Sequence, residues 1–159
     1  MEADLPGGWE GRIRRGPQDR PGARAAGGAT RTEPRQSDED LATAHLGNFP
    51  LPADRGDFGS GAVDGMTADD AFVALLEYEP ASARTALFAR EGMPRRLTTA
   101  DFSPASLQRT LPGQAGTQVF FHEADRAFCL YVVLGNVARA PRTIGEVNRV
   151  LARVKVERR

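Results

Sequence analysis

Cysteine, histidine and lysine are scarce in this chain of 159 residues, which has one Cys, two His and a single Lys. One cysteine excludes a disulfide framework, and with two histidines it also excludes a four-ligand Cys/His zinc site. The longest unbroken apolar run, from Ala127 to Leu134, has eight residues. A membrane-spanning helix needs roughly 20. We therefore expect no metal site, no cofactor and no membrane span.

An excess of charge of one sign is also absent, because 21 basic and 21 acidic residues cancel. A chain without net charge has no overall field that attracts nucleic acid or an anionic membrane. Twenty of the bases are arginine, which beside many alanines and glycines suggests a GC-rich bacterial genome. The N-terminus lacks the apolar segment of about 7 to 15 residues that a secretory signal contains. The sequence thus predicts a cytoplasmic protein, and a lone cysteine fits that compartment.

The first 66 residues contain little from which to build a core. They hold 12 of the 17 Gly, six of the 11 Pro and only three aromatic residues. Residues 7–36 follow neither helical nor strand periodicity, so we expect disorder there, and one short helix over 38–46 at most. The sequence predicts a disordered Gly/Pro/Arg-rich tail and linker at 1–65, followed by a folded domain at 66–159.

The expected tail carries a small basic patch. It consists of Arg12, Arg14, Arg15, Arg20 and Arg24, set against one acid, Asp19. Such a patch can contact an anionic partner, but arginines in a tail are more often simply solvated, and we favour the solvated interpretation.

Capping residues and apolar spacing predict three short helices in the domain, over 68–79, 81–90 and 103–111. Thr67 and Asp70 have the spacing of a capping box and would cap the N-terminus of the first helix. Residues 93–102 are ambiguous, with a short strand as one alternative.

A hairpin is the strongest local signal. TQVFFH and AFCLYVVLG are two β-rich runs separated by EADR, and the second ends at a glycine. Pairing across the turn would place Phe121 opposite Phe128 and Val119 opposite Leu130, so that one face is continuous core. A hairpin alone is too little sheet for independent stability, which argues for helix cover or for pairing with a second chain.

The other face of the hairpin supplies our candidate site. It is apolar with polar tips, and its members include Gln118, Phe120, His122, Cys129 and Tyr131. One hypothesis makes this face an interaction surface. An alternative makes it a small-molecule pocket or the site of a minor enzyme, around His122 and Cys129. No spacing brings together the groups that catalysis needs, so we assign no catalytic residue.

A terminal amphipathic helix is expected after Pro141. Its apolar residues Ile144, Val147, Leu151 and Val154 recur at spacings of three and four. Gly145 interrupts this helix, and one reason for a glycine there is close packing on the sheet.

Basic residues gather near the C-terminus and give nucleic-acid binding as a further alternative. Arg142, Arg149 and Arg153 form a basic surface on the expected helix. The segment lacks interleaved aromatic residues for base stacking, so an ordinary solvated face is the favoured interpretation. Charges of the acidic segment 64–79 and the basic C-terminus can also neutralise each other within the fold.

Taken together, the sequence predicts an α+β domain with short helices, an antiparallel hairpin with one further strand at most, and a terminal helix. The function it favours is a non-enzymatic interaction or accessory protein that works through protein–protein contacts, either with a partner protein or with itself as a homodimer.

Overall fold

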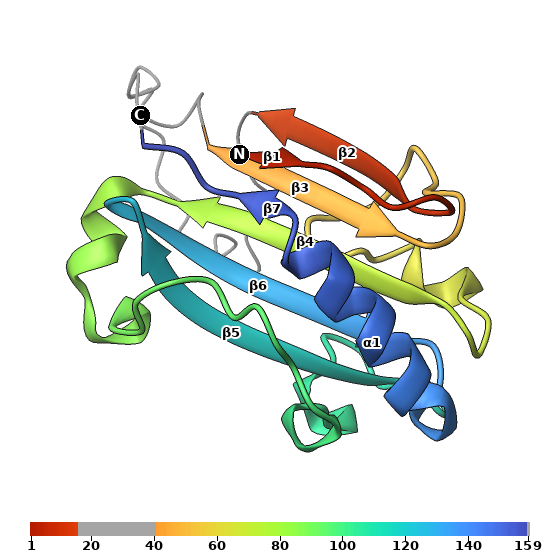
Figure 1. Ribbon diagram of the computed structural model, residues 1–159. Coiled ribbons are helices and arrows are strands. Elements are labelled where there is room, and N and C mark those ends of the chain that lie inside the picture. The colour runs from red at the N-terminus through yellow and green to blue at the C-terminus, as the bar shows by residue number, and fades with distance from the viewer. Residues whose placement is uncertain (16–40, 159) are drawn as a thin grey trace, which may run out of the picture.

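Five antiparallel strands form the main sheet, in the order β2-β3-β4-β6-β5 (Figure 1). The computed structural model describes residues 1–15 and 41–158. In sheet order the strands are β2 (Glu10–Arg15), β3 (Ala42–Gly47), β4 (Ala71–Tyr78), β6 (Arg126–Leu134) and β5 (Ala115–Glu123). A second, two-stranded sheet pairs β1 (Glu2–Ala3) with β7 (Val154–Lys155).

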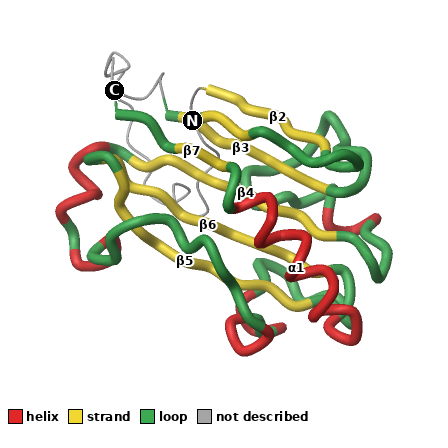
Figure 2. Tube along the Cα trace, in the orientation of Figure 1, coloured by secondary structure: helices red, strands yellow, loops and turns green. Residues whose placement is uncertain are grey.

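Helix is a minor component of the described chain. Helix α1 (Ala140–Leu151) is accompanied by six 3₁₀ turns. These are η1 (Val63–Gly65), η2 (Pro80–Arg84), η3 (Ala86–Phe88), η4 (Thr99–Asp101), η5 (Pro104–Ser106) and η6 (Val137–Arg139). Figure 2 shows strands across the body of the molecule and the short turns at its margins. The expected α+β domain of short helices and a hairpin is therefore wrong, because the structure is mostly sheet.

Strand β4 replaces the helix expected over 68–79. Its first six residues are apolar, and all of them are buried. A short continuous apolar run suits a central strand covered on both faces as well as it suits a buried helix, so periodicity does not separate the two. The capping-box spacing belongs to a turn instead, in which the Thr67 amide donates to Asp70 Oδ2 at 2.6 Å.

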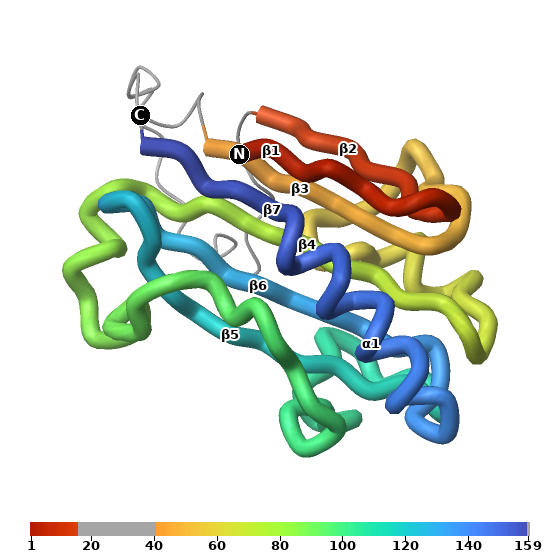
Figure 3. Tube along the Cα trace, in the orientation of Figure 1, coloured from red at the N-terminus to blue at the C-terminus, as the bar shows by residue number. Residues whose placement is uncertain are grey.

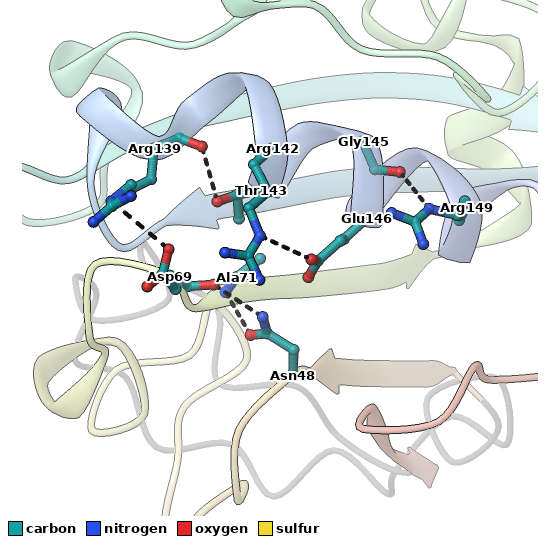
Figure 4. Close-up of polar contacts among 9 residues, drawn as sticks. All are labelled: Asn48, Asp69, Ala71, Arg139, Arg142, Thr143, Gly145, Glu146 and Arg149. Atoms are coloured by element: carbon teal, nitrogen blue, oxygen red, sulfur yellow. Dashed lines mark hydrogen bonds and ion pairs between the residues drawn. The ribbon is translucent and has the colours of Figure 1, made fainter.

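Strand β3 replaces the short helix expected over 38–46, of which residues 38–40 lie outside the described residues. All six residues of β3 are buried, and β3 pairs with β2 on one side and β4 on the other. Asn48 links the end of β3 to the start of β4, since its Oδ1 accepts from the Ala71 amide at 2.7 Å (Figure 4). Most of the disorder expected over 7–36 lies outside the described residues, but residues 10–15 form β2.

The core lies on both sides of the sheet. On one side, here called the helix face, α1 packs together with β1 and β7, which lie next to each other although they come from opposite ends of the chain (Figure 3). On the other side, here called the loop face, residues 48–66 cover Phe72 and Tyr131. The segment that the sequence predicts as a linker is thus part of the core.

Gly59 shows how closely this covering loop approaches the sheet. It has φ +78°, and a Cβ built on it would lie 2.4 Å from a ring carbon of Phe72. A glycine is therefore required here both by the backbone conformation and by space.

The hairpin is confirmed in its register. Phe121 pairs with Phe128 and Val119 with Leu130, as predicted from pairing of the two runs across the turn. The connection is the two residues Ala124 and Asp125, which have φ values of 55° and 60°. Positive φ at both central residues is the geometry of a type I′ turn, whose twist matches that of the strands.

Helix α1 also forms where the sequence predicts it. Ile144, Val147 and Leu151 are buried against the sheet, whereas Val154 lies just beyond the helix, in β7. Gly145 is not explained by close packing, because a Cβ added there meets nothing within 4 Å. Over the described residues, no helix combines the length and apolar character needed to cross a membrane.

Candidate functional site

The outer edge of β2 is the most accessible part of the sheet. All six residues of β2 are exposed, and β3 is its only partner strand among the described residues. The opposite edge of the sheet is covered, because β5 bridges to Glu91 and to Ser103. A strand edge presents unpaired N–H and C=O groups that can pair with another chain. We call the outer side of Glu10–Arg15 the β2 edge.

A buried polar cluster adjoins the β2 edge on the loop face. His45 of β3 is fully buried, and its Nε2–H donates to the Asp57 carbonyl oxygen at 2.7 Å. Its Nδ1 accepts from Nε of Arg55 at 2.9 Å. Because Nδ1 accepts, His45 is the neutral tautomer with its proton on Nε2. The pKa of His45 is lowered to about 4, and burial is the main cause.

Arginines from β2 and from the covering loop gather around this cluster. Arg12 lies opposite His45 in the β2–β3 register, and Arg14 lies opposite Thr43 on the same face. Arg14 Nη2 donates to Asp57 Oδ1 at 2.9 Å, where the Asp57 side chain is 4% exposed. Arg55 comes from the loop. Burial lowers its pKa, and the charges of Arg14 and Arg12 lower it further. We call Arg12, Arg14 and Arg55 the guanidinium cluster.

The residues expected to form an interaction or pocket face lie on the loop face of β5 and β6. The Tyr131 hydroxyl accepts from the Gln108 amide at 3.1 Å, and Phe120 packs edge-on against Phe88, with ring centroids 5.4 Å apart. Cys129 is fully buried and contacts Gln118 Nε2 at 3.4 Å. Burial raises the pKa of the Cys129 thiol to about 11, which keeps it protonated and unreactive near neutral pH.

His122 lies apart from Cys129, at the end of the hairpin. It borders an open hollow of about 380 Å³ that is lined by polar groups, among them Glu91, Arg95, Glu123 and Arg158. A hydrogen bond of 2.7 Å links its Nδ1 to the Phe88 carbonyl oxygen. This bond orients the ring and makes Nε2 the nitrogen that can accept a proton or a hydrogen bond.

The basic surface expected on α1 is partly neutralised. Arg142 lies 3.6 Å from Glu146 on the same helix, and Arg153 lies 4.0 Å from Asp4. Arg149 instead donates to the Gly145 carbonyl oxygen at 3.3 Å (Figure 4). The acidic segment and the basic C-terminal region do meet within the fold, since Arg139 lies 3.8 Å from Asp69. Arg142 and Arg153 thus have acidic neighbours, whereas among the described residues Arg149 has none.

The His45 cluster is not predictable from the sequence pattern. Arg12 and Arg14 fall in the expected solvated tail, and His45 falls in the short helix expected over 38–46. One signal was present: EGRIRR alternates charged residues with Gly and Ile, which is the period of a half-exposed strand.

Comparison with known proteins identifies no relative, because no protein-family model, no curated protein and no solved structure matches the chain. Any functional assignment therefore depends on the geometry alone.

Proposed function

We propose that this protein is a non-enzymatic interaction protein that binds a partner protein along the β2 edge. The observation that carries the proposal is an exposed strand whose outer side pairs with no other strand among the described residues. An extended segment can add to such an edge through main-chain hydrogen bonds, while alternate side chains provide specificity.

The two faces of β2 offer different contacts to such a segment. Ile13, which is 48% exposed, lies on the helix face beside the N-terminal segment. Arg12 and Arg14 lie on the loop face. An added strand would therefore meet an apolar residue on one side and guanidinium groups on the other.

Self-association has less support than binding to a different protein. We expected a homodimer because a lone hairpin with an uncovered face needs a partner. The five-stranded sheet supplies the missing strands, and residues 48–66 cover the loop face. The homodimer stays a prediction, which light scattering after size-exclusion chromatography tests.

Site-specific photo-crosslinking tests the proposed edge. A photoreactive amino acid would replace Ile13 in one variant and Val137 in another, because both side chains are 48% exposed. In cells of the source organism, with the protein at its natural level, we expect a discrete protein adduct from position 13 and none from position 137. Equal labelling at both positions, or no adduct at position 13, would contradict the proposal.

The hollow beside His122 supports a second candidate function, small-molecule binding. Its lining combines three carboxylates with two guanidinium groups, which suits a polar ligand that carries charges of both signs. Cys129 does not take part, because it lies in the core.

A thermal-shift screen against charged metabolites tests this second candidate. A ligand that raises the melting temperature of the native protein should lose that effect with His122→Gln and keep it with Arg142→Gln, which lies on α1 outside the hollow. If the two variants respond alike, the hollow is not a binding site.

A further inference from the structure

The guanidinium cluster gives the β2 edge a preference for one kind of partner. Arg12 and Arg14 point to the loop face because they alternate with Ile13 and Arg15, which lie on the helix face. Arg55 reaches the same region from the covering loop and is 9% exposed. Three positive groups are thus held on one side of a single strand edge.

Hydrogen bonds fix the inner part of this cluster. Arg55 Nη1 donates to the Pro52 carbonyl oxygen at 2.5 Å, and Nε of the same side chain donates to His45. His45 is itself held by the Asp57 carbonyl oxygen. A guanidinium positioned in this way loses little conformational entropy when it binds an anion.

The positive charge of the cluster is only partly compensated. Asp57 pairs with Arg14, and Glu10 lies on the same face of β2, where its Oε2 accepts from the Leu51 amide at 3.2 Å. Among the described residues neither Arg12 nor Arg55 forms an ion pair, and the hydrogen bonds of Arg55 go to His45 and the Pro52 carbonyl oxygen. His45 is neutral at physiological pH and contributes no charge. Arginine binds carboxylates with a planar fork of donors, so Arg12 and Arg55 are suited to receive one.

A second copy of this chain complements the edge less well than an acidic segment does. In a two-fold antiparallel pairing of β2 with itself, facing residues share a face, so Arg12 would lie opposite Arg12, Arg14 or Glu10 of the other copy. The first two registers set like charges opposite each other, which destabilises a strand pair, and the third pairs only residues 10–12 of each copy. A segment with acidic residues at alternate positions has the complementary charge, and apolar residues between them would contact Ile13 on the helix face.

We infer that the partner contributes an extended segment in which acidic and apolar residues alternate, and that Arg12 and Arg55 bind one of its carboxylates. This inference rests on the proposed function, since it assumes that the partner adds to the β2 edge.

Fluorescence anisotropy on the full chain tests the inference. The probes are two short labelled peptides, one alternating glutamate and valine, the other with glutamine in place of glutamate. We expect the glutamate peptide to bind at least about tenfold more tightly, the size of effect expected for desolvated charge pairs. Arg12→Gln should remove most of this difference. Arg15→Gln removes the same charge from the opposite face and should change the affinity less than about twofold, as expected for an exposed charge.

Equal losses from Arg12→Gln and Arg15→Gln would overturn the inference, because the attraction would then be a general effect of charge. Failure of the glutamate peptide to bind would also overturn it. Thermal melts of both variants should match the native protein, since both side chains are exposed.

Hydrogen exchange with bound peptide separates this inference from the proposed function. Protection of β2 amides by both peptides alike would preserve edge binding and reject the acidic preference. The glutamate peptide could instead bind in a way that depends on Arg12 but leaves the β2 amides unprotected. That result would support carboxylate binding by Arg12 and reject the addition of a strand to β2.

Discussion

At the scale of single residues, the most unusual group is His45. A histidine with no exposed surface exchanges two hydrogen bonds to water for one to Arg55 and one to a backbone carbonyl. Both ring nitrogens are thus satisfied only in the neutral form. Protonation would place a positive charge beside Arg55 in a buried site.

This arrangement predicts that the protein loses stability on mild acidification. The unfolded chain binds a proton at His45 below pH 6.5, whereas the folded protein binds it only near pH 4. Because the unfolded state then holds more protons, the free energy of unfolding should fall by about 1.5 kcal/mol between pH 6.5 and pH 5. Urea unfolding at both pH values measures the change.

His45→Gln is the control for the pH effect. Glutamine does not titrate, so the variant should lose most of the pH dependence in this range even where it is less stable overall. A native protein whose stability is flat between pH 6.5 and pH 5 would contradict the assignment of a buried neutral His45.

Among helices and strands, the sequence predicts best those whose residue pattern is compatible with only one type of secondary structure. The β5–β6 hairpin and α1 form as expected, because strict pairing around a short turn and a stripe at helical spacing each fit one element only. Strand β4 was mistaken for a helix because its residues are apolar on both faces. What decides its conformation is the sheet and the covering loop, and neither is visible within the segment itself.

Strand β3 was misinterpreted for a related reason. ATAHLG contains alanine and leucine, which favour helix, and it follows a capping sequence. Its pairing with β2 and β4 is long-range and outweighs these local preferences. Since the candidate site depends on the β2–β3 pair, it could not be predicted from the sequence either, although the arginines of β2 were noticed.

Two glycines with different surroundings test the packing of α1 and of the turn before β4. Gly145→Ala should stabilise the protein by about 1 kcal/mol, because the site has open space and glycine is a poor helix former. Gly135→Ala should destabilise it by several kcal/mol, because the new Cβ would collide with the Thr67 carbonyl oxygen. Urea unfolding measures both, and effects of the same sign would contradict the packing described here.

At the scale of the whole molecule, residues at both ends of the described chain are needed to complete the fold. The N-terminal half of the chain supplies β1, β2 and β3. The backbone amide of Ala42, at the start of β3, also donates to Glu77 Oε2 at 3.1 Å. Glu77 also pairs with Arg126 at 2.8 Å, and both side chains are buried. An ion pair buried in this way connects β3, β4 and β6.

The first 65 residues should therefore be required for folding. A chain of residues 66–159 lacks β1, β2, β3 and the loop that covers Phe72, so it should not unfold cooperatively and should aggregate. Circular dichroism melting and light scattering, compared with the full chain, test this expectation. A stable monomer with a sharp melting transition would restore the division into tail and domain that the sequence predicts.

The proposed function requires that β2 is a strand of the sheet and that its outer edge is available to a partner. Residue-resolved hydrogen exchange on the isolated full-length protein tests both requirements. Amides of an edge strand alternate between those that face the neighbouring strand and those that face outward. We predict slow exchange at alternate residues of Glu10–Arg15 and fast exchange at the residues between them. Uniformly slow exchange would mean that the edge is already covered, and uniformly fast exchange would mean that β2 is not paired with β3; either result would contradict the account.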